Sequence, residues 1–189
     1  MVKKVILGLV VVVAALAVFV SFQPSSYRVI RSVTIAGAPA DVFTQVNDFH
    51  NWNAWSPWAK LDPAVKETHE GPPSGTGAIF RWAGDKKVGE GNMTILESQP
   101  ASRVRIRLEF IKPFASVADT VFDFAPDGAG TKVTWTMSGE SNFLSKAFCL
   151  FMGGMDKAIG PDFEKGLAQM KAAVESKKAP EPARVAAVG

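Results

Sequence analysis

The sequence has too few cysteines for covalent cross-linking. Among its 189 residues Cys149 is the single cysteine, so no intrachain disulfide can form and packing must hold the fold together. Its neighbours Phe148, Leu150 and Phe151 are apolar and offer nothing that would stabilise a thiolate. We therefore interpret Cys149 as a small core residue rather than a nucleophile.

Motifs for familiar chemistry and for nucleic-acid binding are also lacking. His50 and His69 stand far apart, and neither has a His, Cys or carboxylate at the spacing of a metal motif. There is no Gly-x-Ser-x-Gly and no P-loop, and the glycines near expected strands open no helix that could cradle a phosphate. The formal net charge is +3, without a long run of Lys or Arg. We expect no metal, no cofactor and no nucleic-acid partner.

One long apolar run stands at the start of the chain. The segment from Val5 to Val20 carries no charge and follows Lys3 and Lys4, and with Phe22 it is long enough to cross a bilayer as a helix. It is either a signal peptide or an uncleaved anchor. Alanines within the run could form a cleavage site, but the apolar residues continue beyond them, which favours a membrane anchor over residues 1–24.

The charges that flank this run predict its orientation. Lys3, Lys4 and the amino terminus outweigh Arg28 and Arg31 on the other side. The positive-inside rule then places the domain outside the cytoplasm, as a single-pass periplasmic or extracytoplasmic protein. Secretion after cleavage is the alternative.

The body of the domain begins with a strand and a short helical segment. Between Tyr27 and Ala36, the residues Val29, Arg31, Val33 and Ile35 alternate with a second set, which is typical of a strand. A helix with one apolar face follows Pro39. The segment 51–58, NWNAWSPW, holds three tryptophans, which we interpret as a hydrophobic plug rather than as a surface that stacks on a ligand.

From about residue 65 the sequence alternates between strand-sized runs and turn residues. We expect strands over 78–83, 88–97, 103–111, 116–124 and 132–139, giving six or seven antiparallel strands in all. A long helix with an apolar stripe from Ile159 to Val174 follows, and it either restarts or bends at Pro161. Residues 177–189 are predicted to be a disordered tail.

The strand from Arg103 to Phe110 has the strictest alternation in the chain. Its apolar residues face one side, and Arg103, Arg105 and Arg107 face the other. The basic side could meet phosphate groups, but Asp119, Asp123 and Glu97 on neighbouring strands favour an ordinary solvated sheet face.

This order of elements predicts an α+β fold in which a curved antiparallel sheet wraps a long C-terminal helix. Such a groove is not filled everywhere, so it could hold an apolar ligand; the alternative is that the same side chains fill a solid core. The residues expected to line the ligand site are Phe80, Trp82, Met93, Leu108, Phe110, Phe122, Trp135, Met137, Met155, Ile159 and Phe163.

Several motifs resemble one known superfamily. They are APADVFTQVNDFHNWNAWSPW after the first strand, GPPSGTGAIFRWAG, VGEGNMTILES, GTKVTWTMSGE, and MDKAIGPDFEKGLAQMK in the last helix. Together they resemble the START-like superfamily, specifically the bacterial polyketide cyclase/dehydrase or SRPBCC family, over residues 25–176. The resemblance implies a Bet v 1-like helix-grip fold with a hydrophobic tunnel under the long helix. It implies no particular activity.

The expected function is binding of an apolar small molecule or lipid by a membrane-tethered domain. A polyketide cyclase- or aromatase-like enzyme is one alternative, and a structural or interaction protein of the envelope is another. Catalysis would need a placed acid or base, for which Glu70, Asp119, Glu140 and Asp156 are the candidates, and the sequence singles out none of them.

Overall fold

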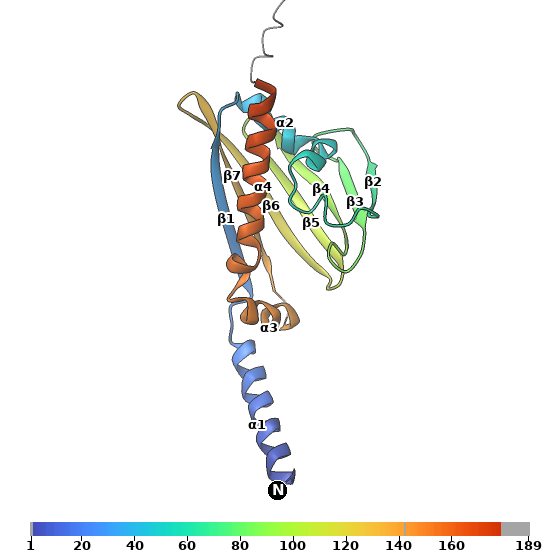
Figure 1. Ribbon diagram of the computed structural model, residues 1–189, viewed down its shortest axis with the longest axis vertical. Helices are drawn as coiled ribbons and strands as arrows, with labels where there is room; N and C mark the ends of the chain where they lie inside the picture. Colours follow the sequence, from blue (N-terminus) through green and yellow to red (C-terminus); the bar gives the residue numbers. More distant parts are fainter. Residues whose placement is uncertain (1, 142, 179–189) are drawn as a thin grey trace, which may run out of the picture.

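We describe the protein from a computed structural model (Figure 1). The described part of the chain comprises residues 2–141 and 143–178, without the side chains of Leu144, Phe148, Cys149, Phe151 and Lys178. The interpretation of Cys149 as a core residue and residues 179–189 of the predicted tail therefore lie outside the described residues, whereas residues 177 and 178 belong to the last helix and not to a tail.

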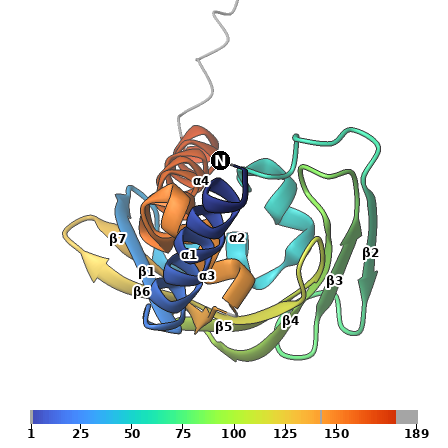
Figure 2. The same cartoon turned by 90° about the horizontal axis from the view of Figure 1, so that it is seen from below.

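Seven antiparallel strands form one sheet, as the alternating sequence pattern predicts. In sequence order they are β1 (Ser26–Ile35), β2 (Lys66–Glu70), β3 (Ile79–Ala83), β4 (Glu90–Gln99), β5 (Arg103–Lys112), β6 (Ser116–Asp127) and β7 (Gly130–Glu140). Their order across the sheet is β1-β7-β6-β5-β4-β3-β2, so β1 closes against the last strand. Seen from below, the sheet curls around the helices (Figure 2).

Three helices cover the concave face of this sheet: α2 (Pro39–Asn47), the short 3₁₀ helix η1 (Phe49–Ala54) and the long α4 (Met155–Lys178). A fourth, α3 (Phe143–Met152), lies at one end of the domain, where it contacts α1 and α4. Helix α4 packs mainly on β1, whereas α2 packs on β5, β6 and β7. The fold is the helix-grip arrangement that the sequence predicts, and α4 continues through Pro161.

The tryptophan-rich segment is part of the core. Trp52 and Trp55 are buried, and their indole N–H groups donate to the backbone oxygens of Val46 and Gln45 at 3.0 and 2.9 Å. Because both indoles are satisfied by the end of α2, they fix η1 against that helix. This supports the interpretation of the segment as a plug.

Arg31, on the helix-facing side of β1, joins α4 to β1 through ion pairs. The Arg31 guanidinium donates to Asp156 at 2.8 and 3.0 Å and to Glu164 at 2.6 Å. Gly160 lies between these two carboxylates on α4, and a Cβ there would come within 2.1 Å of the guanidinium. The ion pair with Arg31 lowers the pKa of Asp156. Arg31 therefore shares the helix-facing side of β1 with Val29 and Val33 because α4 supplies its partners.

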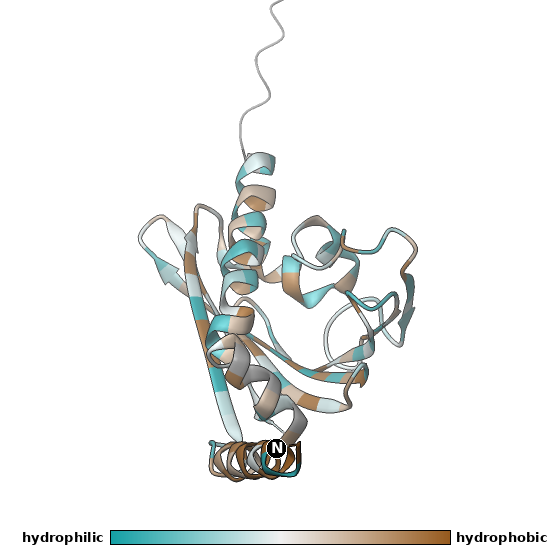
Figure 3. Ribbon diagram, turned by 60° about the horizontal axis from the view of Figure 1, so that its bottom comes forward, coloured by the Kyte–Doolittle hydropathy of each residue, from teal (hydrophilic) through white to brown (hydrophobic). Residues whose placement is uncertain are grey.

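Helix α1 (Val2–Ser21) projects away from the domain (Figure 1) and, apart from Lys3 and Lys4, is mostly apolar (Figure 3). Among the described residues it is the one helix long and apolar enough to cross a membrane, a test that signal sequences also pass. Residues 22–25 link it to β1. The link is held by the Ser141 N–H on the Ser25 oxygen at 2.6 Å and by Lys146 Nζ on the Gln23 oxygen at 2.7 Å.

Candidate ligand-binding site

The half of the concave face further from α1, which we call its upper half, is a packed aromatic core. The Trp135 ring stacks on Phe163 with centroids 3.9 Å apart and planes 7° from parallel, and it lies 4.9 Å from Phe122 and 5.7 Å from Trp55. Gly166 of α4 allows this approach, since a Cβ there would lie 3.1 Å from the Trp135 ring. The structure thus places Phe122, Trp135 and Phe163 together as core residues that contact one another.

Most of the other predicted ligand-binding residues lie lower on the same face and are only partly buried. They pack at the margin of the core, and we call them the concave strip: Phe80, Trp82, Leu108, Phe110, Met155 and Ile159.

The strand register explains why the concave strip is open. Leu108 pairs with Ala118 on one side and Met93 on the other, and Phe110 pairs with Gly91. Small residues in these rows leave large apolar neighbours without full cover. Met93 and Met137, at 8% and 6% exposure, mark the boundary between the strip and the packed core.

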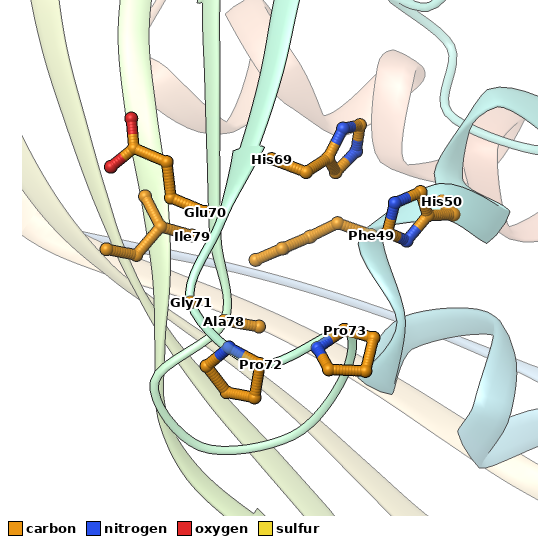
Figure 4. Close-up of a pocket in the computed structure, with 9 residues that line it drawn as sticks. All are labelled: Phe49, His50, His69, Glu70, Gly71, Pro72, Pro73, Ala78 and Ile79. Atoms are coloured by element: carbon orange, nitrogen blue, oxygen red, sulfur yellow. The ribbon is translucent and has the colours of Figure 1, made fainter.

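An aromatic row connects the concave strip to a surface pocket. Phe110 lies 5.9 Å from Trp82, Trp82 lies 6.0 Å from Phe80, and Phe80 lies 6.0 Å from Phe49, measured between ring centroids. Phe49 is a wall of the pocket, which has a volume of about 200 Å³ (Figure 4). The other walls are His50, His69, Glu70, Gly71, Pro72, Pro73, Ala78 and Ile79.

This pocket did not emerge from the sequence, because its walls come from η1 and from both sides of the β2–β3 turn. Ligand pockets for drug-sized molecules typically measure roughly 300–1,000 Å³, so this one could hold only a small group or one end of a longer molecule. Its polar side is formed by two histidine rings stacked with centroids 4.1 Å apart.

The stacked histidines differ in their environments. His50 Nδ1 lies 2.7 Å from an Asp48 carboxylate oxygen. Burial lowers the pKa of His69, and the neighbouring His50 lowers it further, against smaller opposite effects of Glu67 and Asp48. The surroundings of His69 therefore favour its neutral form.

A titration of His69 tests this arrangement. We expect the pKa of His69, followed by NMR, to lie below its ordinary value of 6.5, and to move back towards 6.5 in His50→Gln. Because the folded state disfavours the charged ring, the stability contributed by neutral His69 is complete above 6.5 and is lost as the pH falls through the lower folded pKa. A His69 that titrates above 6.5 would contradict this account.

Two buried polar atoms on the concave face have no hydrogen-bond partner among the described residues. They are Thr120 Oγ1 and Trp135 Nε1, on residues that are 3% and 2% exposed. Thr120 pairs with Met137 on β7, two positions from Trp135, so the two residues are diagonal neighbours on one face. Unpaired buried polar atoms are costly, so each calls for a partner such as an ordered water or a bound group. The sequence carried the signal for Thr120, a polar residue between Ala118 and Phe122 on an apolar strand face.

The carboxylates considered for catalysis are engaged elsewhere or exposed. Glu70 pairs with Arg81 at 2.9 Å, Asp119 with Arg105 at 2.9 Å, and Asp156 with Arg31 at 2.8 Å. Glu140 is exposed at the end of β7.

The arginines on the basic side of β5 likewise form ion pairs with neighbouring carboxylates. Arg103 pairs with Asp123 at 2.8 Å, and Arg107 pairs with Glu109 of its own strand at 2.7 Å. Within residues 2–141 and 143–178, no three His, Cys, Asp or Glu side chains gather in a way that could hold a metal ion.

Comparison with known proteins identifies the family. The chain belongs to the polyketide cyclase/dehydrase and lipid transport family, whose pattern matches residues 26–175. This places it in the START-like superfamily that the sequence motifs resemble, and it ties the fold to hydrophobic ligand binding in general. No curated protein matches the chain.

Solved structures share the fold at low sequence identity. A protein from Rhizobium leguminosarum aligns with a TM-score of 0.60 and 14% identity, covering 82% of this chain and 97% of its own. Ara h 8.0201 aligns with a TM-score of 0.55 and 11% identity, covering 80% and 99%. DynU16, from the dynemicin biosynthetic locus, aligns with a TM-score of 0.52 and 16% identity, covering 79% of this chain and 48% of its own.

Proposed function

We propose that this protein binds a lipid-like molecule along the concave strip while α1 holds the domain at a membrane. The observation that carries the proposal is the partly exposed row of apolar side chains on the helix-covered face of the sheet. Apolar surface on a concave face, next to a rigid packed core, is the usual character of a site for an apolar ligand. The aromatic row would guide one end of the molecule towards the histidine pocket.

The unpaired atoms of Thr120 and Trp135 favour a ligand with one polar group. An indole N–H can only donate, and a hydroxyl can donate or accept, so both would be satisfied by a carbonyl, carboxyl or hydroxyl oxygen. A fatty acyl chain with an oxygen-bearing end has this combination. The methionines at the boundary of the strip would adapt to its shape.

Membrane attachment is supported by α1. Val20 is the one residue of α1 that is buried in the protein, so the rest of the apolar helix surface is free to contact another environment. Lys3 and Lys4 lie in its first turn, and on the positive-inside rule they would remain on the cytoplasmic side with the domain on the opposite side. The contiguous core contains no α1 residue, so the domain without residues 1–24 is expected to fold alone.

A cyclase-like enzyme is the second candidate, but the geometry favours it less. Three of the four candidate carboxylates form ion pairs with arginines, and the fourth is exposed at a strand end. Binding requires only the shape and apolarity of the concave face.

The direct test is native mass spectrometry of the domain lacking residues 1–24, with extraction and identification of any bound lipid. We expect adducts of acyl-chain mass and uptake of an apolar fluorescent probe that the extracted lipid displaces. Consistently empty protein that takes up no probe would overturn the proposal.

The role of Thr120 is tested by Thr120→Val, which keeps the shape and removes the hydroxyl. We expect the affinity for a fatty acid to fall about fivefold to tenfold, because one hydrogen bond to the acid is lost, while a hydrocarbon probe binds unchanged. The free energy of unfolding of the empty domain should stay level or rise, because the variant removes a buried unpaired hydroxyl. Titration with both ligands and denaturant unfolding measure these effects. Equal loss for both ligands would show that Thr120 acts only through packing.

A further inference from the structure

Exposed apolar side chains gather at one end of the domain. Outside α1, most of the large apolar residues that are strongly exposed lie where β1 begins, β5 turns into β6, and α3 follows β7. We call this set the apolar base: Phe22, Ile111, Phe114, Val117, Phe143 and Met152, exposed between 46% and 84%. Isolated apolar residues on a surface are ordinary, but such a concentration marks an interaction site.

Helix α3 forms part of the apolar base and is unusually apolar for a surface helix. Ser145 and Lys146 are its only polar residues in FLSKAFCLFM, and Lys146 donates to the Gln23 oxygen at 2.7 Å. Phe143 and Met152, at its two ends, are 49% and 48% exposed. A helix with so few polar residues, and with large apolar side chains exposed at both ends, favours an apolar environment beyond the domain.

The position of α1 indicates which environment this is. Helix α1 leaves the domain from the same end, and α3 lies crosswise beside the point where α1 stops (Figure 1). Residues 22–25 are too short to separate the two helices widely, and they are hydrogen-bonded to the start of α3. Any bilayer that contains α1 must therefore lie against the apolar base.

Charge adds little to this contact. Lys86, Lys87, Lys146 and Lys157 lie at this end, against Asp85 and Glu140. Lys112 pairs with Glu90 at 2.6 Å. Lys146 is already held by the Gln23 oxygen, so the remaining surplus of positive charge is small and insertion of apolar side chains would dominate.

We infer that the apolar base is a membrane-docking surface, with α3 lying in the headgroup layer of the bilayer that holds α1. The inference rests on the proposed anchoring role of α1 and adds a second, independent contact with lipid. Phe110, at the end of the concave strip, is one residue from Ile111 of the apolar base. Docking would therefore turn the open end of the strip towards the lipid surface.

Site-specific fluorescence on the full chain in phosphatidylcholine vesicles tests the inference. In a Cys149→Ser background, single cysteines at Phe114, Phe143 and Met152 carry an environment-sensitive dye, and Leu96→Cys is the control. Leu96 is 42% exposed but lies towards the other end of β4, away from the apolar base. We expect nitroxide lipids to quench the three base labels at least about threefold more than the label at position 96, with little change in high salt.

The outcomes separate docking from anchoring and from ligand binding. If the chain resists alkaline extraction but all four labels remain exposed to water, α1 is an anchor and the inference of a docking surface is wrong. If the base labels are shielded without quenching by nitroxide lipids, a protein partner covers them and the inference is overturned. If the chain is extracted from the vesicles, both anchoring and docking fail.

Hydrogen exchange on the unmodified chain guards against misfolding of the labelled variants. We expect at least about tenfold slower exchange of the amides of α3 in vesicles than in detergent-free domain lacking residues 1–24, with no change in the β6–β7 turn at the opposite end. Equal exchange in α3 under both conditions would also overturn the inference.

Discussion

Replacing Trp135 with alanine is expected to lower the free energy of unfolding by about 3 to 5 kcal/mol, the range for large aromatic side chains removed from packed cores. Trp135 is 2% exposed and stacks on Phe163, with Phe122 and Trp55 around it. Its indole N–H has no hydrogen-bond partner among the residues that the structure describes, so the expected loss comes from packing. Denaturant unfolding of the domain lacking residues 1–24 measures it.

Trp135→Phe is the matched control, because a smaller ring preserves stacking on Phe163. We expect it to cost less than half as much as the alanine variant. A loss below about 1 kcal/mol for Trp135→Ala would mean that the neighbours do not depend on this ring. The upper half of the concave face would then be open to a ligand, as the wider predicted lining implies.

Replacing Leu108 with aspartate is expected to weaken binding of an acyl ligand by at least about tenfold. An apolar chain bound there would desolvate the carboxylate, and this desolvation costs free energy. Leu108 is partly buried on the concave strip, so the carboxylate stays hydrated in the empty protein and the fold survives. Displacement of an apolar fluorescent probe gives the affinity, and circular dichroism checks the fold.

Leu96→Asp provides the comparison for Leu108→Asp. It adds the same charge to a strand residue that is 42% exposed and lies outside the core. We expect no change in affinity. Equal weakening in both variants would show that charge acts generally on the domain, and unchanged binding in Leu108→Asp would remove the concave strip from the proposed site.

The sequence predicts the sheet best where one face is buried and the other is charged. Strand β5 alternates strictly, and its partners Asp119 and Asp123 pair with Arg105 and Arg103 as expected. Strand β2, KETHE, is polar and lies at a sheet edge, so it carries no alternating apolar signal and its bounds could not be placed. Glu97 lies opposite Arg105 across the β4–β5 pair, as expected, and it also accepts a hydrogen bond from Gln99.

The candidate site was harder to predict, because it depends on contacts between distant segments. Alternation identified the residues of the concave face but could not separate the packed stack around Trp135 from the partly exposed strip around Leu108. That division depends on where α4 and η1 press against the sheet. The stacking of His50 on His69 and the clamp of Arg31 on α4 join segments that no local pattern relates.

The brevity of the stretch between α1 and β1 limits how far the domain can travel. Four fully extended residues span roughly 14 Å. This is far less than the distance between two membranes that a freely diffusing lipid carrier would have to cross. If α1 spans the membrane as proposed, the domain stays beside one leaflet and cannot move further from it than this linker allows. On the proposed binding function, a ligand taken up from that leaflet would then have to pass to a second protein that approaches the same surface.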